Sequence, residues 1–297
     1  MSNTLEDKDW NLLLRRIKDG KCTPFIGAGA CYGKIPLGNE ISRDWASTHK
    51  YPLNDCSDLA RVAQFLAVNE DPMSPKEKIK DIIKEHLDKV DIQYFKEPDE
   101  PHGVLADLPL PVYITTNYDD FMIQALKSRN KKPKQELCRW NKYIQKTIPK
   151  ASELNPDALN PVVFHFHGSY EIPESLVLTE DDYFDFLVNI SRDEDLIPAR
   201  IQQALTGTSL LFLGYKIADL DLRVLLRSLN SYFERSLSRA HISVQLVPDV
   251  GSKEQKEQAQ KYLDSYFEKL DIRVYWGDCC EFSAELKRRW EIYNHVK

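Results

Sequence analysis

The turn Gly27-Ala28-Gly29 is the first segment of the chain whose residue types could do chemistry. It follows an apolar run, Cys22–Ile26, and glycine there allows a tight turn and lets phosphate oxygens approach main-chain N–H groups. The chain has only 11 glycines, where average usage would give about 20, so their positions are informative. The spacing to Gly33 is G-x-G-x-x-x-G, and the acidic residue of the dinucleotide fingerprint is missing, which disfavours an ordinary nicotinamide dehydrogenase. A tight turn without a ligand is the alternative.

Asn117 and Asp119 follow a second apolar run, Val112–Thr116. The Asn117 amide offers both donors and an acceptor, so it could orient a water molecule or hold a hydroxyl group. Asp119 could accept a hydrogen bond from an amide, or it could simply cap the helix that we expect at 119–128.

Two histidines end a third apolar run, Val162–Phe166, in the sequence Phe-His-Phe-His-Gly. The period of two predicts that His165 and His167 lie on one face of a strand. We do not expect a metal site, because no third ligand stands at a suitable spacing and the chain has no C-x-x-C pair. His167 stands at the strand end beside Gly168 and suits acid–base chemistry near neutral pH, whereas His165 is expected to be structural.

Hydroxyl and glycine residues flank a further apolar run, Ser209–Leu213. Thr208 and Gly207 precede it and Gly214 follows it, and such residues suit either a ribose or phosphate site or an ordinary turn. Asp219 and Asp221 come later and are interpreted as acids in the first turn of a helix.

The order of predicted elements defines the fold class as α/β. Short apolar strands that alternate with helices predict a parallel sheet covered by helices on both faces, in a single domain over 1–297. Residues 38–107 are mostly helical and are expected to form an inserted helical module, while 129–160 is expected to be irregular and 176–178 a short strand. Ligands of such sheets bind at the carboxyl ends of the strands, where the polar segments above are found. The expected strands are 22–26, 112–116, 162–166, 209–213, 241–247 and 272–276.

Composition excludes several classes of protein. With 297 residues, 40 Lys and Arg, 46 Asp and Glu, and a net charge of −6, the chain is not expected to bind nucleic acid through its bulk charge. No apolar run approaches the roughly 20 residues of a membrane span, and the acidic N-terminus is not expected to be a signal peptide. The six cysteines are expected to be reduced thiols of a cytoplasmic protein.

The ordered series FIGAG, a helical insertion, TTNYD, HFHGS and GTSLLFLGY resembles the sirtuin fold over about residues 20–280. The resemblance implies a Rossmann-type sheet and NAD as ligand. It further implies that the glycine turn holds the NAD phosphates, that Asn117 and Asp119 hold the nicotinamide ribose and carboxamide, and that His167 is the base acting on the ribose hydroxyls. The remaining residues that the resemblance assigns to NAD are Gly27, Ala28, Gly29, Thr116, Gly207, Thr208 and Ser209, the last three on the adenosine side.

Two departures from the sirtuin pattern narrow the expected activity. The paired C-x-x-C zinc ligands of deacylases are absent, and Thr116 stands where those enzymes carry glutamine. The chain is more similar to the sirtuin-like NADases of bacterial antiphage defence, some of which assemble with a HerA-type ATPase. The resemblance therefore implies hydrolysis of NAD+ to nicotinamide and ADP-ribose without a metal, in a homo-oligomer or with such an ATPase. A non-hydrolysing NAD sensor and an NAD-dependent deacylase are the alternatives.

Overall fold

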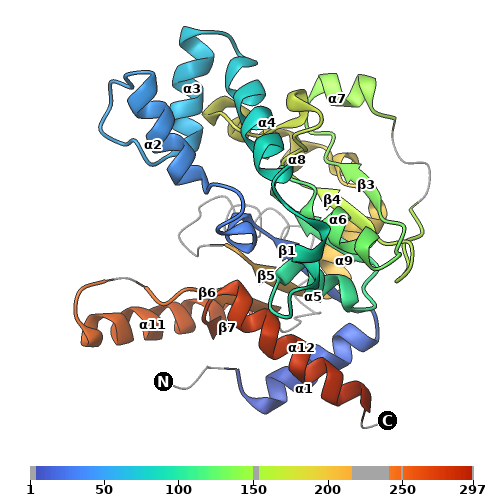
Figure 1. The fold of residues 1–297 in the computed structure, drawn as a ribbon. Helices are drawn as coiled ribbons and strands as arrows, with labels where there is room; N and C mark the ends of the chain where they lie inside the picture. The colour runs from blue at the N-terminus through green and yellow to red at the C-terminus, as the bar shows by residue number, and fades with distance from the viewer. Residues whose placement is uncertain (1–4, 150–153, 216–240, 249, 296–297) are drawn as a thin grey trace.

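Seven parallel strands form one sheet in the computed structural model, which describes residues 5–149, 154–215, 241–248 and 250–295 (Figure 1). The strand order is β3-β4-β2-β1-β5-β6-β7, and every neighbouring pair is parallel. This confirms the predicted α/β fold class. The strands are β1 (Cys22–Ile26), β2 (Val112–Thr115), β3 (Lys134–Leu137), β4 (Val162–His165), β5 (Ser209–Leu213), β6 (His241–Gln245) and β7 (Ile272–Trp276).

The central strands are apolar because helices cover both faces of the sheet. Side chains alternate along β1, so that Ile26 belongs to one hydrophobic cluster and Phe25 to the other. Helices α1 (Asp7–Lys18), α5 (Pro101–Asp107), α6 (Phe121–Ser128) and α12 (Cys279–His295) contribute to the first cluster. Helices α8 (Glu180–Arg192), α9 (Ala199–Gly207) and α11 (Lys253–Glu268) contribute to the second.

Three helices of the predicted insertion, α2 (Gly38–Thr48), α3 (Leu59–Asn69) and α4 (Ser74–Leu87), form a group that follows the end of β1 (Figure 1). The group is joined to the start of α8 by polar contacts. Lys76 on α4 lies 2.8 Å from the Asp182 carboxylate in a largely buried ion pair, and the Gln64 amide donates to Asp181 at 2.9 Å. The module is therefore bound to the helix that borders the carboxyl end of β4.

Short elements complete the chain and include two that the sequence did not predict. The 3-10 helices are η1 (Ala28–Cys31), η2 (Ile92–Lys96), η3 (Pro173–Ser175) and η4 (Glu194–Leu196). Strand β3 and helix α7 (Lys142–Thr147) lie in the stretch expected to be irregular. Among the described strands, β3 pairs only with β4, and such an edge strand keeps polar residues that hide the strand pattern.

The segment 176–178 is not a strand, which corrects that prediction. Its apolar side chains are fully buried, and the Val177 N–H donates to the His167 carbonyl outside the sheet ladder. Burial rather than strand pairing explains its composition. The helix predicted after Asp219 and Asp221 lies outside the described residues. In the part of the chain that is described, no helix is long and apolar enough to cross a membrane.

Candidate functional site

The loops after β1 and β5 meet at the point where the strand order changes direction. The chain leaves β1 towards β2 on one side and later returns to β5 on the other, and such switch points are where α/β sheets bind ligands. The Gly27 N–H donates to the Leu213 carbonyl at 2.8 Å and the Gly29 N–H to the Gly214 carbonyl at 2.9 Å. A Cβ atom on Gly29 would lie 2.9 Å from the Gly214 Cα. Glycine is therefore needed here because two loops touch.

The glycine turn leads into η1, whose first residues reach the surface. Ala28 is exposed and Gly29 half-exposed, whereas Gly27 is buried. The N–H groups of both glycines already pair with main-chain carbonyls, so they join the two loops and are not free for a phosphate. The last residue of η1, Cys31, turns inward and is buried against the residues that follow β2.

Three hydrogen bonds hold Asn117 in place. Its side-chain Nδ2 donates to the Gly27 carbonyl and to the Cys31 sulfur, both at 3.2 Å, and its main-chain N–H donates to the Thr115 hydroxyl at 3.0 Å. A carbonyl oxygen can only accept, so Gly27 fixes which end of the amide is the NH2 group. Within the described part of the chain no group pairs with the Asn117 Oδ1, which is left to accept from a ligand or water.

Asp119 accepts two hydrogen bonds from within the protein. One carboxylate oxygen accepts from the Phe121 N–H at 3.0 Å, at the start of α6, and the other accepts from the Cys31 thiol at 3.4 Å. The side chain is buried beside Asn117 and Cys31. Asp119 therefore belongs to the same cluster as Asn117.

His167 lies on the other side of the sheet edge from this cluster. Strand β4 ends at His165, and the turn at 166–168 includes Gly168 with a φ of +88°. A Cβ atom on Gly168 would overlap the Ser175 main chain. The turn sends the His167 ring against Tyr183 and Phe186 of α8, with ring centroids at 5.5 Å and 5.0 Å.

The two histidines therefore do not share a face, and that prediction is wrong because the strand ends one pleat earlier than the sequence pattern indicates. The His165 Nδ1 lies 3.4 Å from the Asn117 main-chain carbonyl, on the side of the first hydrophobic cluster. Among the contacts of the described residues, none joins His167 directly to Asn117. Burial lowers the pKa of His167 to about 3, so its imidazole is neutral at physiological pH.

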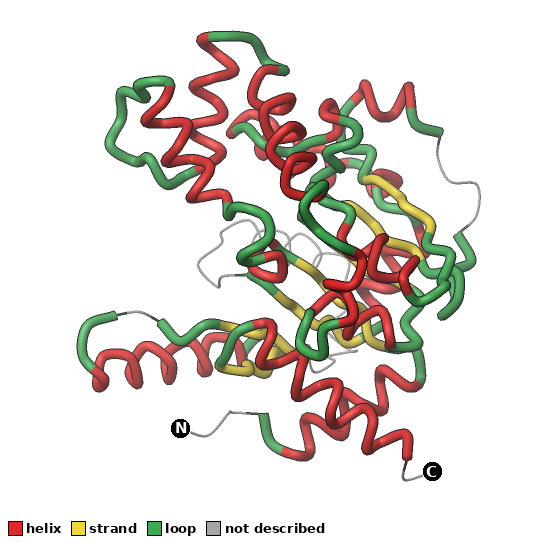
Figure 2. Tube along the Cα trace, in the orientation of Figure 1, coloured by secondary structure: helices red, strands yellow, loops and turns green. Residues whose placement is uncertain are grey.

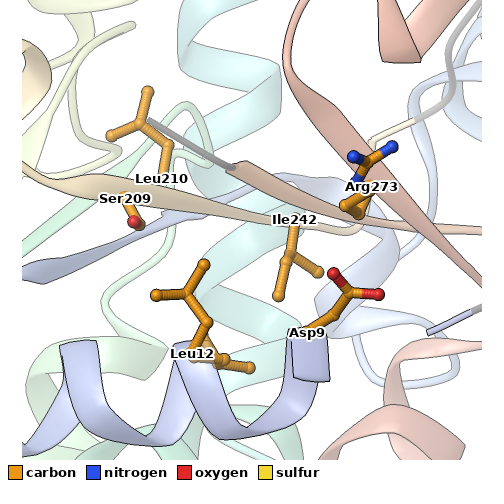
Figure 3. Close-up of a pocket in the computed structure, with 7 residues that line it drawn as sticks. Asp9, Leu12, Ser209, Leu210, Ile242 and Arg273 are labelled. Atoms are coloured by element: carbon orange, nitrogen blue, oxygen red, sulfur yellow. The ribbon is translucent and has the colours of Figure 1, made fainter. Parts of the chain in front are cut away.

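The segment Gly207-Thr208-Ser209 lies away from the other candidate residues. Ser209 pairs with Cys22 at the beginning of β1, and the Thr208 hydroxyl donates to the Thr23 hydroxyl at 2.7 Å. The segment is thus at the amino edge of the sheet, and the prediction that it faces the adenosine half of the same site does not match the fold. Ser209 instead lines a pocket between α1 and strands β5, β6 and β7, with Leu210, Ile242 and Arg273 (Figure 3).

Gly214 and Tyr215 lie at the carboxyl end of β5, beside the loops that follow β1 and β2. The Tyr215 hydroxyl donates to the Ile26 carbonyl at 3.0 Å and lies 2.7 Å from the Thr116 hydroxyl. Thr116 is half-exposed at the mouth of the site. The loops that follow β1, β2 and β5 therefore bring Gly27, Thr116, Asn117 and Tyr215 into contact, whereas His167, after β4, contacts α8 instead. The strands that these loops follow are yellow in Figure 2.

No group of three or more His, Cys, Asp or Glu side chains in the described ranges is placed to hold a metal ion. The site is built from amide, carboxylate, imidazole and hydroxyl groups.

This fold and edge cluster define a class of protein that binds a ligand at the switch point of a parallel sheet. The chain belongs to the SIR2-like family: the sequence pattern of the SIR2-like domain matches residues 111–275, more than half of its length. The match begins just before β2 and includes Asn117, Asp119 and His167.

Several curated relatives carry the name NAD(+) hydrolase ThsA. The protein from Acinetobacter baumannii is 21% identical over 295 residues, which cover 95% of this chain and 56% of that protein. The protein from Bacillus cereus is 29% identical over 234 residues, which cover 76% of this chain and 43% of that protein. The one from Enterococcus faecium is 27% identical, with 80% and 46% covered. The chain thus spans about half the length of the curated relatives it matches.

Proposed function

We propose that this chain hydrolyses NAD+ at the bond between nicotinamide and ribose, giving nicotinamide and ADP-ribose. The observation that carries the proposal is the Asn117 amide, whose NH2 end is fixed by Gly27 and Cys31 while its carbonyl oxygen pairs with none of the described residues. Membership of the SIR2-like family and similarity to NAD(+) hydrolases support the same reaction.

Cleavage of the nicotinamide–ribose bond passes through a ribose with oxocarbenium character. The Asn117 Oδ1 would accept from the attacking water or a ribose hydroxyl, and Asp119 would accept from the nicotinamide amide. The neutral imidazole of His167 would accept a hydrogen bond from a ribose hydroxyl, and because it stays neutral it places no cation beside the developing positive charge. Positioning and electrostatics would supply most of the rate enhancement.

The biological setting that we propose follows from the resemblance to sirtuin-like NADases. The chain would deplete NAD in the cytoplasm during antiphage defence, as a homo-oligomer or in assembly with a HerA-type ATPase. An unrestrained NADase would harm its own cell, so the isolated chain is expected to be weakly active until it assembles. Turnover against protein concentration and against added ATPase, with mass measured in solution, tests this part separately.

The catalytic proposal is tested by nicotinamide release from NAD+ by the purified chain, with and without an acyl-lysine peptide. We expect release without the peptide, and we expect Asn117→Ala and His167→Ala each to lower kcat by about 100-fold or more. Asn69→Ala is the matched control, because the Asn69 amide only bonds to its own helix.

Circular dichroism and thermal unfolding show whether each variant is folded. Release that depends strictly on the peptide would favour a deacylase, and NAD binding without release in any assembly state would favour a sensor. Wild-type turnover by folded Asn117→Ala and His167→Ala would overturn the assignment of both residues.

A further inference from the structure

A buried polar chain extends from Asn117 and Asp119 back to helix α5, beyond the residues that the proposed reaction uses. The Cys31 Sγ accepts from the Asn117 Nδ2 at 3.2 Å, donates to the Asp119 carboxylate at 3.4 Å and lies 3.8 Å from the His102 Nε2. The His102 Nδ1 in turn lies 2.7 Å from a Glu100 carboxylate oxygen. All five side chains are at most 8% exposed.

Helix α5 fixes the end of this polar chain that lies farthest from Asn117, at Glu100 and His102. Glu100 is the N-cap residue of α5, and its carboxylate accepts from the main-chain N–H groups of His102 and Gly103 as well as from the His102 ring. A carboxylate with three donors on one helix turn has little freedom to move. The His102 ring also packs edge-on against Phe121, the residue whose N–H binds Asp119. The orientation of His102 is therefore set from two directions.

The order Cys–His–Glu resembles that of a thiol nucleophile, but the surroundings exclude this role. Burial, together with the nearby Asp119 carboxylate, raises the pKa of Cys31 well above its usual value, so the sulfur stays protonated. A protonated, buried thiol that donates to a carboxylate is a hydrogen-bond bridge and not a nucleophile.

The hydrogen-bond donors and acceptors of this buried polar chain form one consistent pattern. The Nδ1–H of His102 donates to Glu100, and the thiol proton goes to Asp119, so the sulfur is left to accept from the Asn117 Nδ2, while the His102 Nε2 lies 3.8 Å from the sulfur. Asn117 then keeps its NH2 end in the protein and its carbonyl oxygen outward. Reversing the amide would set its oxygen against the Gly27 carbonyl, which has no hydrogen to donate.

We propose that Cys31, His102 and Glu100 are positioning residues that hold the Asn117 amide and the Asp119 carboxylate in the orientation needed for the reaction. The proposal rests on the proposed NAD+ hydrolysis, and it assigns a role to a buried Glu–His–Cys chain that contacts no substrate. Cys31 is the link that both site residues share.

Two substitutions of Cys31 separate positioning from packing. Serine keeps the donor and acceptor, whereas alanine removes both at a similar volume, so positioning predicts that Cys31→Ser has at least ten times the kcat of Cys31→Ala. We expect Cys31→Ala to lower kcat about ten-fold or more while KM changes less than three-fold. A purely apolar packing role predicts the reverse order, because serine is the worse core residue.

Cys22→Ala is the matched control, because Cys22 is an equally buried thiol of the same hydrophobic cluster at the other end of β1. It should lose stability without losing kcat. His102→Leu should lower kcat in the natural background and have little further effect in Cys31→Ala, since both act through the same sulfur. Equal kcat for folded Cys31→Ala and the unsubstituted chain would overturn the proposal.

A readout without turnover keeps this test separate from that of the proposed function. The Asn117 side-chain NH2 signals in a 1H–15N spectrum, assigned by their loss in Asn117→Ala, should be sharp in the natural chain and in Cys31→Ser but exchange-broadened in Cys31→Ala. That pattern without any NAD+ hydrolysis would overturn the proposed function and leave the ordering of Asn117 intact. Unchanged Asn117 signals in Cys31→Ala would overturn the positioning role.

Discussion

Two buried histidines border the same sheet edge in opposite environments. His102 faces the Glu100 carboxylate and the Cys31 sulfur, whereas His167 is surrounded by the rings of Phe166, Tyr183 and Phe186. Burial alone would lower the pKa of both. For His102 the Glu100 and Asp119 carboxylates together outweigh burial and raise the pKa, whereas for His167 burial lowers the pKa to about 3. Both histidines are buried, so the presence or absence of a neighbouring carboxylate decides the direction in which the pKa shifts.

This difference divides the site into a polar half and an aromatic half. The polar half, built on η1, α5 and the end of β2, holds groups in fixed directions through hydrogen bonds. The aromatic half, built on α8 and the end of β4, keeps one imidazole neutral by excluding water. A site that must orient a water molecule and tolerate a developing cation needs both properties.

The largest expected effect on the free energy of unfolding comes from removing Glu100, which anchors the polar half of the site to α5. Glu100→Ala removes the N-cap of α5 and leaves buried His102 without its carboxylate, so we expect unfolding free energy to fall by about 3–5 kcal/mol in urea titrations. Asp58→Ala is the matched control, since Asp58 caps α3 with two main-chain N–H groups but contacts no buried histidine. We expect it to cost about 1 kcal/mol. Equal losses would show that the buried pair contributes nothing.

A second effect concerns the aromatic half at acidic pH. The folded pKa of His167 lies below its unfolded value, so the unfolded chain binds the additional proton and stability falls as pH drops below about 6.5. Between pH 7 and pH 5 the natural chain should lose about 2 kcal/mol more unfolding free energy than His167→Gln. His86→Gln, on α4 outside the site, serves as the control. Parallel stability curves for the natural chain and His167→Gln would contradict a neutral, buried His167.

The smallest effect has the opposite sign and sharpens the contrast. The pKa of His102 is raised in the folded chain, so its contribution to stability is complete below the unfolded value and is lost as pH rises through the folded one. The stability difference between the natural chain and His102→Gln should therefore shrink from pH 6 to pH 9. A difference that grows with pH would mean that His102 is neutral and that Glu100 does not control it.

Local patterns predicted the sheet because the fold places apolar strands between two layers of helices. The runs 22–26 and 209–213 match β1 and β5 residue for residue. The pattern could not find β3, whose sequence Lys-Gln-Glu-Leu lies at the sheet edge, and it mistook the buried segment 176–178 for a strand. An apolar run indicates that a segment is buried, but it does not show whether that segment pairs with another strand.

Sequence position indicates candidate residues where one strand end supplies them, and it gives no signal where distant segments meet. Asn117 and Asp119 directly follow β2, so strand position alone located them. The segment Gly207–Ser209 was given to the wrong end of β5, because hydroxyl and glycine residues flank both ends of that strand. Cys31 and His102 gave no local signal, since their significance comes from contacts across 71 positions of the chain.

The meeting of the loops after β1 and β5 also limits how this protein can vary. A methyl group on Gly214 would overlap the Gly27 carbonyl, and one on Gly29 would press on the Gly214 backbone. Both positions are already glycine, so a larger residue at one of them cannot be compensated by a smaller residue at the other. Each loop therefore requires glycine in the other. Any substitution at Gly29 or Gly214 would have to shift the main chain that follows β1 or β5.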